Sequence, residues 1–445
     1  MVYDNVLKNP DDFNFQVQKL GQGKFTNPIK DEIFVDDDER IAFASQIKNL
    51  RRQFETNDPI PSFEKAGARR KIFHNPSTTK VGIVTCGGLC PGLNNVIKGL
   101  VKVLEQSYGI EHIFGIRYGY KGLTRHSKHN PIRLTASSVD QIHQQGGTIL
   151  GSSRGNQDPE EMVNELEARG INLLFCIGGD GTLKGAQAIA EAANQRNANI
   201  SIVGVPKTID NDLGFVEKTF GFETSVQVST DIISSAYSEA KGAENGIGIV
   251  KLMGRDSGFI TATASLANSV VDFCLIPEIP FQITGPDNIC ETIQNKLAEK
   301  NYAVVVVAEG AGQDLFKNNK KRLDASGNIL KDDIGELLKQ SLSNHFDSQK
   351  IPISIKYLDP SYHIRSVAAN ASDSVFCYLL AEYAVHAGMS GKTNLVIGYW
   401  NNFFTHVPIR LATRERRIVE LDSALWRGVV SATQQNQKAE ELRNN

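Results

Sequence analysis

The sequence predicts an α/β protein of two Rossmann-like lobes, each with a mainly parallel sheet covered by helices. Two observations predict this class. From Lys80 onwards, short segments that are apolar along their whole length alternate with helical segments, which is typical of parallel strands buried on both faces. After residue 222 the same alternation begins again. In such sheets ligands bind beyond the carboxyl ends of the strands.

The first lobe is expected to begin at the buried strand "KVGIVTC". The helix that follows starts at Pro91 and ends at Gly109, a residue type that favours helix C-termini. In chain order the expected elements are strand 80–86, helix 91–109, strand 112–119, short helix 137–147, helix 160–170, strand 171–177, helix 182–196 and strand 200–206. The segments that follow three of these strands are rich in glycine or charge, so they are the candidate binding segments.

The second lobe repeats this pattern. Its expected elements are helix 224–242, strands 247–254 and 271–278, helix 290–301 and strand 302–310; a helix over 366–388 is expected to return the chain to the first lobe. The expected domain organisation is an N-terminal extension over 1–77, a first lobe over 78–222 plus 365–425, a second lobe over 223–364 and a C-terminal tail over 426–445. The extension shows no clean period and is expected to pack on the main body.

Composition and charge exclude several function classes. Of the 445 residues, 40% are hydrophobic and 22% are charged, as in ordinary globular proteins. The net charge of -2 provides no general basic field, so neither a nucleic acid nor a membrane is expected as a partner. No apolar run approaches the ~20 residues that span a bilayer, and the polar, acidic N-terminus is unlike a secretory or transit peptide, so a cytoplasmic location is expected.

Two further features have simple interpretations. The six cysteines form no CxxC pair and have no histidine partner at zinc-finger spacing, which favours reduced and mostly buried thiols. Segment 317–328, "KNNKKRLDASGN", is compatible with a phosphate patch or with a solvated loop. Because it offers no glycine nest and no placement at a strand end, the loop is favoured.

Two glycine-rich segments follow strands of the first lobe. "TCGGLCPGLNN" combines a Gly-Gly turn with Pro91-Gly92 at a helix start, which is compatible with a phosphate site and equally with a tight turn. In "CIGGDGTLKGA" the glycines let a backbone approach a phosphate closely, and Asp180 adds a carboxylate. Such a carboxylate makes sense if it holds Mg²⁺; the alternative is that it caps the following helix.

The segment "PKTIDND" is the most specific signal. It places Lys207, Thr208, Asp210 and Asp212 within six residues at the end of strand 200–206. Alternation puts the two aspartates on the same side if the segment stays extended. One carboxylate can then take a proton from an attacking hydroxyl while the other manages the metal or orients the first, and the lysine supplies a cation for a terminal phosphate. These groups predict phosphoryl transfer to an alcohol.

From about Lys80 to about Leu421 the chain resembles the 6-phosphofructokinases. The stretches that carry the resemblance are "TCGGLCPGLNNVI", "GGTILGSSRG", "IGGDGT", "GVPKTIDNDL", "GFETSVQ", "IVKLMGRDSGFI", "LIPEIPF", "VAEGAGQD" and "KYLDPSYHIRSVAANASD". It is most similar to the ATP-dependent branch that includes plant and trypanosomatid enzymes, which is related to the pyrophosphate-dependent enzymes. The resemblance implies Mg²⁺-assisted transfer of the γ-phosphoryl group of ATP to the 1-hydroxyl of fructose 6-phosphate, in glycolysis.

The resemblance also implies roles for individual residues. In the first lobe, which is expected to bind the nucleotide, Asp210 is the implied base, with Thr208 and Asp212 beside it. Lys207 and Arg154 are the implied catalytic cations. Asp180 is the implied Mg²⁺ ligand. The residues implied to line the nucleotide phosphates are Gly88, Arg154, Gly181, Thr182 and Gly185. Thr208 and Asp210 are also expected to touch the sugar, which the second lobe holds through Met253, Gly254, Arg255 and Glu309. Lys356, Tyr362 and Arg365 are expected to bind its phosphate.

The family further implies an active site in the cleft between the lobes, an allosteric enzyme, and self-association as a homodimer or homotetramer. Two departures from the bacterial ATP-dependent enzymes concern the sugar phosphate. Lys356 and Tyr362 stand where those enzymes carry arginine and histidine, so phosphate binding depends more on Arg365. Gly246 replaces an arginine that a neighbouring subunit contributes, which leaves open whether subunits share this site.

The phosphoryl donor is predicted from Gly181. Pyrophosphate-dependent enzymes of the family carry an aspartate there, whose carboxylate would repel and fill the space that an α-phosphate needs, so glycine favours ATP. Lys207, in contrast, is typical of the pyrophosphate-dependent enzymes, which keeps pyrophosphate as an alternative.

Two other functions remain as alternatives. The motif "GGDGT" also occurs in NAD kinases and diacylglycerol kinases, but these lack "PKTIDND" and the "MGR" stretch. A non-catalytic subunit that senses nucleotide and sugar phosphate would be expected to lack the base or the metal carboxylate. Asp180, Asp210 and Asp212 are all present, which favours a catalytic subunit.

Overall fold

The computed structural model describes residues 6–7, 9, 12–30, 33–56, 60–286, 288–316 and 329–435. Its contacts divide the chain into two compact units. Unit 1 comprises Met1–Gly221 and Ser366–Arg417, and unit 2 comprises Phe222–Arg365 and Ile418–Asn445. The basic segment 317–328, with its two interpretations, lies outside the described residues.

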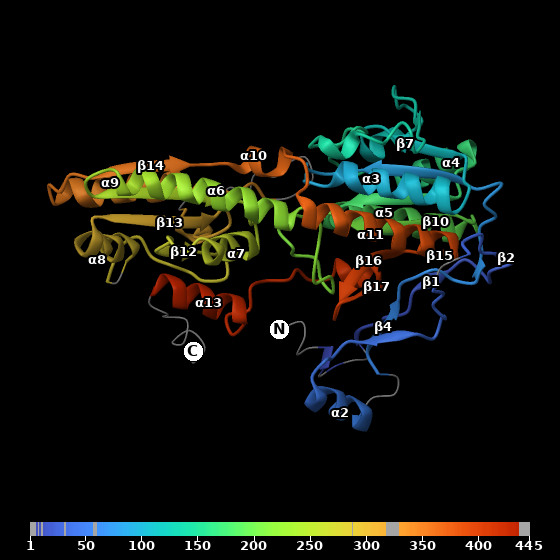
Figure 1. Cartoon of the computed structure of the whole chain (residues 1–445), viewed down its shortest axis with the longest axis horizontal. Coiled ribbons are helices and arrows are strands. Elements are labelled where there is room, and N and C mark those ends of the chain that lie inside the picture. The colour runs from blue at the N-terminus through green and yellow to red at the C-terminus, as the bar shows by residue number, and fades with distance from the viewer. Residues whose placement is uncertain are drawn as a thin grey trace. The chain divides into compact units, whose positions relative to one another are not determined.

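Unit 1 is built on a nine-stranded sheet (Figure 1). Its strand order is β3 (Arg40–Ala42), β4 (Ser62–Lys65), β17 (Phe403–Pro408), β16 (Leu395–Trp400), β10 (Ser201–Pro206), β9 (Leu173–Gly178), β6 (Lys80–Thr85), β7 (His112–Ile116) and β8 (Ile132–Arg133). The central strands from β16 to β7 run parallel, and the outer strands pair antiparallel. β9 and β10 are buried along their whole length, so both faces need cover.

Helices provide this cover on both faces. α4 (Pro159–Arg169) and α5 (Asp180–Gln195) share a hydrophobic core with Leu174 and Cys176 of β9. Leu173 points to the opposite face and packs against Gly388 in α11 (Ala371–Met389). α11 lies against α3 (Leu93–Lys102), which continues as a π-helical turn over 103–107. Two short helices, α2 (Ile47–Thr56) and α12 (Ile409–Ala412), complete the described helices of this unit.

Three expected boundaries in unit 1 differ from the structure. Segment 137–147 forms only a 3₁₀ turn over 142–144, because Thr135 and Ser138 exchange hydrogen bonds between side chain and backbone that compete with a helix. α5 begins at Asp180, two residues earlier than expected, since the extended Gly179 takes the N-cap position. The helix expected over 366–388 begins only at Ala371, where the Asn370 side chain caps it.

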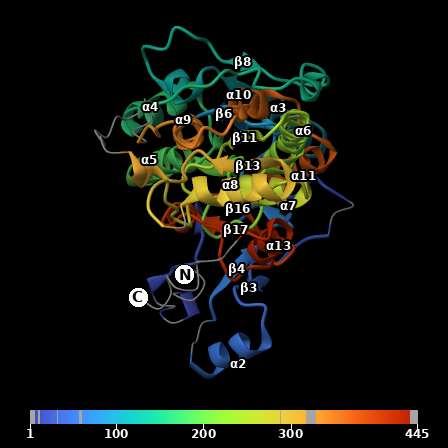
Figure 2. The ribbon, with the colours of Figure 1, turned by 90° about the vertical axis from the view of Figure 1, so that its left-hand side faces the viewer.

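Unit 2 contains a four-stranded sheet in which every pair is parallel. Its order is β12 (Phe273–Leu275), β13 (Tyr302–Ala308), β11 (Gly246–Leu252) and β14 (Ser354–Leu358). Figure 2 shows the helices around these strands: α6 (Phe222–Lys241), α7 (Phe259–Ala267), α8 (Ile289–Lys300) and α9 (Ile334–Ser348), with α10 (Ser361–Ser366) following β14. Both units are therefore α/β with mainly parallel sheets, which confirms the predicted fold class.

The end of the chain differs from the expected tail. Residues 424–433 form a helix, α13 (Ala424–Thr433), and its Trp426 is only 1% exposed. Trp426 and Val429 share a core cluster with Ala262 of α7 and Cys274 of β12. Burial of these apolar side chains attaches residues 418–435 to unit 2, whereas the sequence-based division placed those up to 425 with the first lobe.

The N-terminal region of unit 1 contributes strands to its sheets. β3 and β4 extend the main sheet, β1 (Gln18–Lys19) pairs with β15 (Lys392–Thr393), and β2 (Phe25–Thr26) pairs with β5 (Lys71–Ile72). Its apolar side chains join the main core: Phe15, Phe43 and Phe63 pack around Phe215. The expected extension over 1–77 therefore includes structural parts of unit 1.

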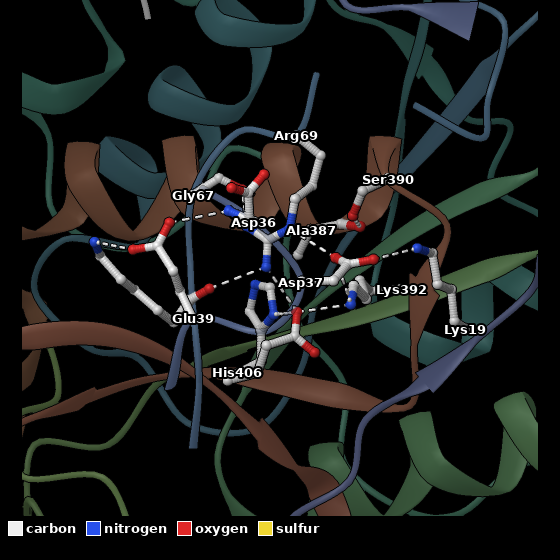
Figure 3. Close-up of polar contacts among 12 residues, drawn as sticks. Lys19, Asp36, Asp37, Glu39, Gly67, Arg69, Ala387, Ser390, Lys392 and His406 are labelled. Carbon is white, nitrogen blue, oxygen red and sulfur yellow. Dashed lines mark hydrogen bonds and ion pairs between the residues drawn. The ribbon is translucent and has the colours of Figure 1, made fainter. Parts of the chain in front are cut away.

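A polar cluster that is buried except at Asp37, the Glu64 cluster, holds this region against the later strands (Figure 3). It consists of Asp37, Glu64, Arg69, Lys392 and His406. The Glu64 carboxylate accepts hydrogen bonds from Arg69 (2.8 Å) and His406 (3.0 Å) and pairs with Lys392 (2.7 Å). Burial alone would raise the pKa of Glu64, but bonds from His406 and Lys392 hold it at about 2.

Two sequence-based expectations concern whole residue classes. All six cysteines are buried and free of disulfides, as their spacing indicated, and burial raises the thiol pKa of each, of Cys90 and Cys176 for example. Across the described part of the chain, every helix is too short or too polar to span a bilayer.

Candidate active site

The three candidate segments of unit 1 follow neighbouring strands. β9 pairs with both β6 and β10, and Gly178 at its end lies opposite Pro206 at the end of β10. The Lys207 amide donates to the Gly178 carbonyl at 3.0 Å. Parallel strands end at the same edge of a sheet, so the segments 86–92, 179–185 and 207–212 all begin at one edge.

Lys207 connects two of these segments. Its ammonium group donates to the Gly88 carbonyl at 2.6 Å, and the side chain is buried. Burial lowers the pKa of Lys207; the neighbouring Arg154 lowers it further, while Asp210 opposes the shift. A cation therefore lies between the first glycine-rich turn and the carboxylate of the third segment.

The third segment is not extended, so the condition under which alternation would put Asp210 and Asp212 on one side is not met. Asn211 has a φ of 53°, which turns the backbone between them. The Asp212 carboxylate accepts hydrogen bonds from Thr208 (3.1 Å) and from Arg416 (2.9 Å). Asp210 lies near Lys207 and opposes the lowering of the lysine pKa by burial. Left-handed backbone is tolerated best by glycine and asparagine, which explains why a turn forms at this residue.

Thr208 links the two aspartates. Its hydroxyl accepts a hydrogen bond from the Asp210 amide at 3.1 Å and donates to the Asp212 carboxylate. Its carbonyl accepts from the Thr219 hydroxyl at 2.6 Å. Thr208 and Asp212 therefore form the internal support of the turn that presents Asp210.

The second segment forms the N-terminus of α5. Asp180 is its first residue and does not cap the helix; its carboxylate pairs with Lys184 at 3.0 Å. A Cβ atom at Gly181 would meet nothing within 4 Å, whereas one at Gly185 would lie 2.6 Å from the Tyr120 ring. Open space at Gly181 suits a ligand, while Gly185 is required for packing and its contact with phosphate stays a prediction. Thr182 is buried, and its carbonyl accepts from the Tyr120 hydroxyl at 2.7 Å.

Arg154 lies in a segment that is bonded to the first glycine-rich turn. The Gly87 amide donates to the Ser153 carbonyl at 3.1 Å, and the Ser152 hydroxyl donates to the Gly87 carbonyl at 2.6 Å. The Arg154 side chain is exposed and lies close enough to Lys207 to lower its pKa. Unit 1 thus gathers two cations, Asp180, Asp210 and the start of a helix around one sheet edge.

The residues expected to hold a sugar follow two paired strands of unit 2. Met253, Gly254 and Arg255 come directly after β11, and Glu309 follows β13, with Leu252 opposite Ala308. The Gly310 amide donates to the Gly254 carbonyl at 3.0 Å. Burial raises the pKa of Glu309, and Arg255 and Lys251 oppose that shift. A carboxylate and a guanidinium are therefore neighbours at this edge.

The residues expected to bind a sugar phosphate belong to β14 and α10. Lys356 lies within β14, while Tyr362 and Arg365 lie on α10. The Arg365 guanidinium lies 4.6 Å from the centre of the Tyr362 ring, and that tyrosine is 77% exposed. Tyr362 is therefore exposed, while Arg365 is half-buried.

The comparisons with known proteins identify the family. The family described as Phosphofructokinase matches residues 80–388, more than half of the chain. This chain belongs to the phosphofructokinase family. The resemblance that the motifs indicated is thereby confirmed.

Phosphofructokinase relatives match over nearly the whole chain. An "ATP-dependent 6-phosphofructokinase" of Borreliella burgdorferi is 45% identical and covers 96% of this chain and 98% of its own. One of Trypanosoma cruzi is 42% identical and covers 94% of this chain and 87% of its own. The crystal structure of a pyrophosphate-dependent phosphofructokinase from Marinobacter aquaeolei has a TM-score of 0.66 at 19% identity, covering 80% of this chain and 91% of its own. That likeness shows a shared fold.

Some residues that contact the candidate segments of either unit were not predicted. Arg416 pairs with Asp212 across 204 positions of sequence, and the Arg417 guanidinium donates to the carbonyls of Val216 (2.7 Å) and Glu217 (2.8 Å). Both stand in the basic run "RERR", which is typical of a solvated surface, so the sequence held no signal for them. Lys251 was also missed, although a lysine in the apolar strand "IGIVKLMG" is a signal.

Proposed function

We propose that this chain is an ATP-dependent 6-phosphofructokinase. It transfers the γ-phosphoryl group of ATP to the 1-hydroxyl of fructose 6-phosphate and releases fructose 1,6-bisphosphate and ADP. Relatives at 42 and 45% identity carry this name. The observation that carries the proposal is the shared edge of β6, β9 and β10, where Lys207 joins Gly88 and lies beside Asp210. Phosphoryl transfer needs such a positioned carboxylate and cation.

In this reaction Asp210 is the base. Its carboxylate takes the proton of the sugar 1-hydroxyl while the hydroxyl oxygen forms a bond to the γ-phosphorus and the bond from that phosphorus to the ADP oxygen breaks. Thr208 and Asp212 hold the turn that presents Asp210. Lys207 and Arg154 stabilise the charge on the transferred group, and the first amides of α5 bind phosphate oxygens.

Asp180 is the proposed ligand of Mg²⁺. In the described residues, groups of three or more histidine, cysteine, aspartate or glutamate side chains that could enclose a metal are absent. A single carboxylate at the start of α5 fits a Mg²⁺ ion that takes its other ligands from ATP and water, which is the usual mode for this ion. When bound, Mg²⁺ neutralises phosphate charge. Gly88, Gly181 and Thr182 are the proposed phosphate contacts of unit 1.

Unit 2 is proposed to bind the sugar phosphate. Glu309 and Arg255 suit sugar hydroxyls, because one accepts and the other donates charge-assisted hydrogen bonds. Met253 and Gly254 complete that contact. Arg365, with Lys356 and Tyr362, is proposed to bind the 6-phosphate, since a planar guanidinium matches phosphate oxygens in pairs.

An assay of the purified protein with Mg²⁺, fructose 6-phosphate and either ATP or pyrophosphate tests the function. We expect turnover with ATP, because Gly181 leaves space at the start of α5. If the protein turned over with pyrophosphate but not with ATP, the donor would be the one that Lys207 indicates and not the one that Gly181 indicates. Binding of ATP and fructose 6-phosphate without product would support a sensing subunit.

Four family properties stay predictions for this chain: a homodimer or homotetramer, allosteric control, a role in glycolysis and a cytoplasmic location. Sedimentation of the purified protein tests the first, and the dependence of turnover on sugar-phosphate concentration tests the second. A sigmoidal dependence is expected from an allosteric oligomer.

A further inference from the structure

A single ammonium group in unit 2 connects the starts of two helices. Lys251 is the second-last residue of β11, and its side chain is mostly buried. Its Nζ lies 3.1 Å from Oδ2 of Asp333 and 2.9 Å from Oδ2 of Asp359. A buried lysine is costly unless it is paired, so both carboxylates compensate one charge.

Each of these carboxylates also bonds to the start of a helix with its other oxygen: Asp333 is the N-cap of α9, and Asp359 lies two residues before the first residue of α10. Oδ1 of Asp333 accepts hydrogen bonds from the amides of Gly335 (3.1 Å) and Glu336 (3.2 Å), at the start of α9. Oδ1 of Asp359 accepts from the Ser361 amide (3.2 Å) and the Ser361 hydroxyl (2.5 Å), at the start of α10. Lys251 therefore joins β11 to two helix N-termini through two aspartates.

The elements joined in this way carry the proposed sugar-phosphate residues. β11 leads directly into Met253 and Arg255, and α10 carries Tyr362 and Arg365. The Tyr357 hydroxyl in β14 donates to Oδ1 of Asp333 at 2.8 Å, so the strand that precedes α10 belongs to the same network. Displacement of Asp359 would move the start of the helix on which Arg365 lies.

We propose that Lys251 is a positioning residue for the sugar-phosphate site: it sets the place of α10, and so of Arg365, relative to Arg255 and Glu309. This inference rests on the proposed function of unit 2. It concerns a residue that touches no substrate and acts through Asp333 and Asp359. The nearby Glu309 gives a second reason for the lysine, because Asp359 raises the pKa of Glu309 while Lys251 lowers it, so the cation separates two neighbouring carboxylates.

The test is the kinetics of Lys251→Met, which keeps the length of the side chain and removes the charge. We expect the KM for fructose 6-phosphate to rise roughly tenfold, as misplacement of a binding group implies. The KM for ATP and kcat should stay within about threefold, because the charge at the unit 1 edge is untouched. Lys251→Arg should recover most of the affinity, since it restores both ion pairs.

Lys300→Met is the matched control. Lys300 also pairs with an aspartate, Asp272, at 2.6 Å, but it ends α8 beside the first residue of β13, at the opposite edge of the same sheet. Loss of this ion pair should leave the KM for fructose 6-phosphate unchanged. Asp359→Asn provides a second variant. When it is combined with Lys251→Met, the KM for fructose 6-phosphate should rise little beyond that of Lys251→Met alone, because both changes break the same network.

Three outcomes separate the inference from the proposed function. An active wild type whose KM for fructose 6-phosphate is unchanged in Lys251→Met overturns the inference alone. A fall of the apparent kcat in proportion to the folded fraction, seen by circular dichroism, with both KM values unchanged in Lys251→Met and in Asp359→Asn, also overturns it, since that indicates a purely structural lysine. A folded wild type that does not bind fructose 6-phosphate by calorimetry overturns the proposed function and this inference with it.

Discussion

In unit 1 the buried lysine of the candidate site bonds to the backbone, whereas in unit 2 the mostly buried lysine beside the candidate residues bonds to two carboxylates. Lys207 donates to a carbonyl of the glycine-rich turn, and the Asp210 amide is held by Thr208. Lys251, in contrast, bridges two aspartates. Backbone groups at strand ends are fixed by the sheet, while paired side chains move with their helices. We therefore expect changes in unit 1 to affect turnover and changes in unit 2 to affect sugar affinity.

The largest expected effect is that of Asp210→Ser. Loss of the base should lower kcat on the order of 100-fold or more, with a modest change in either KM. Steady-state kinetics with ATP and fructose 6-phosphate measure this effect. Asp231→Ser, on the exposed side of α6, is the control and should behave as wild type. Turnover of Asp210→Ser near the wild-type value would reject the assignment of the base.

A smaller effect is expected from Gly181→Asp. A Cβ atom at Gly181 would meet nothing within 4 Å, so the variant should fold. Its carboxylate would repel a nucleotide phosphate, and kcat/KM for ATP should fall on the order of 50-fold, since like charges brought together cost several kcal/mol. Any fall in kcat/KM for pyrophosphate in this variant should be smaller than the fall for ATP. Gly181→Ala separates charge from size: if it loses as much ATP activity as the aspartate, repulsion is not the cause.

In unit 2, Arg365→Met should raise the KM for fructose 6-phosphate roughly tenfold, because a hydrogen bond between charged groups is lost. Its kcat at saturating sugar phosphate should change little, and so should the KM for ATP. Tyr362→Phe keeps the ring next to the guanidinium and should have a smaller effect. A large fall in the kcat of Arg365→Met with an unchanged KM for fructose 6-phosphate would contradict the expectation that unit 2 determines sugar affinity and unit 1 determines turnover.

The smallest kinetic effect is expected from the Glu64 cluster, an ionic network of unit 1 whose residues lie outside the three candidate segments. The pKa of Glu64 in the folded protein is about 2, below its ordinary value of 4.5. Its contribution to stability is therefore complete above about pH 4.5 and is lost as the pH falls towards 2. Glu64→Gln should remove up to about 3 kcal/mol of unfolding free energy at pH 7 and flatten the acid part of the stability profile.

Urea unfolding between pH 3 and pH 7 measures that effect. Glu39→Gln removes an exposed ion pair with Lys65 and serves as the control, since exposed pairs contribute little. The kcat of Glu64→Gln should equal that of wild type under conditions where it is folded. If Glu64→Gln lost turnover while it remained folded, the Glu64 cluster would influence the candidate site of unit 1, contrary to this prediction.

Much of the fold and part of the site were predictable from local patterns. Mostly apolar segments identified β6, β9, β10, β11 and β13, because burial on both faces leaves few polar positions in such strands. The strand β14 was missed, since its residues are only partly buried and its sequence alternates with polar residues. The helix α13 was missed because its apolar residues are covered by α7 and β12, which precede it by well over a hundred positions.

The sequence by itself determined which residues stand at the strand ends and which chemistry they carry. Glycine turns, strand ends and charged groups are local properties of the chain. Only the tertiary structure decided their partners: Asp212 with Arg416, Lys207 with Gly88, and Lys251 with both Asp333 and Asp359. These partners are distant in sequence, and the packing of strands and helices selects them. A charge that is buried by that packing must be compensated by whichever group the fold brings near it.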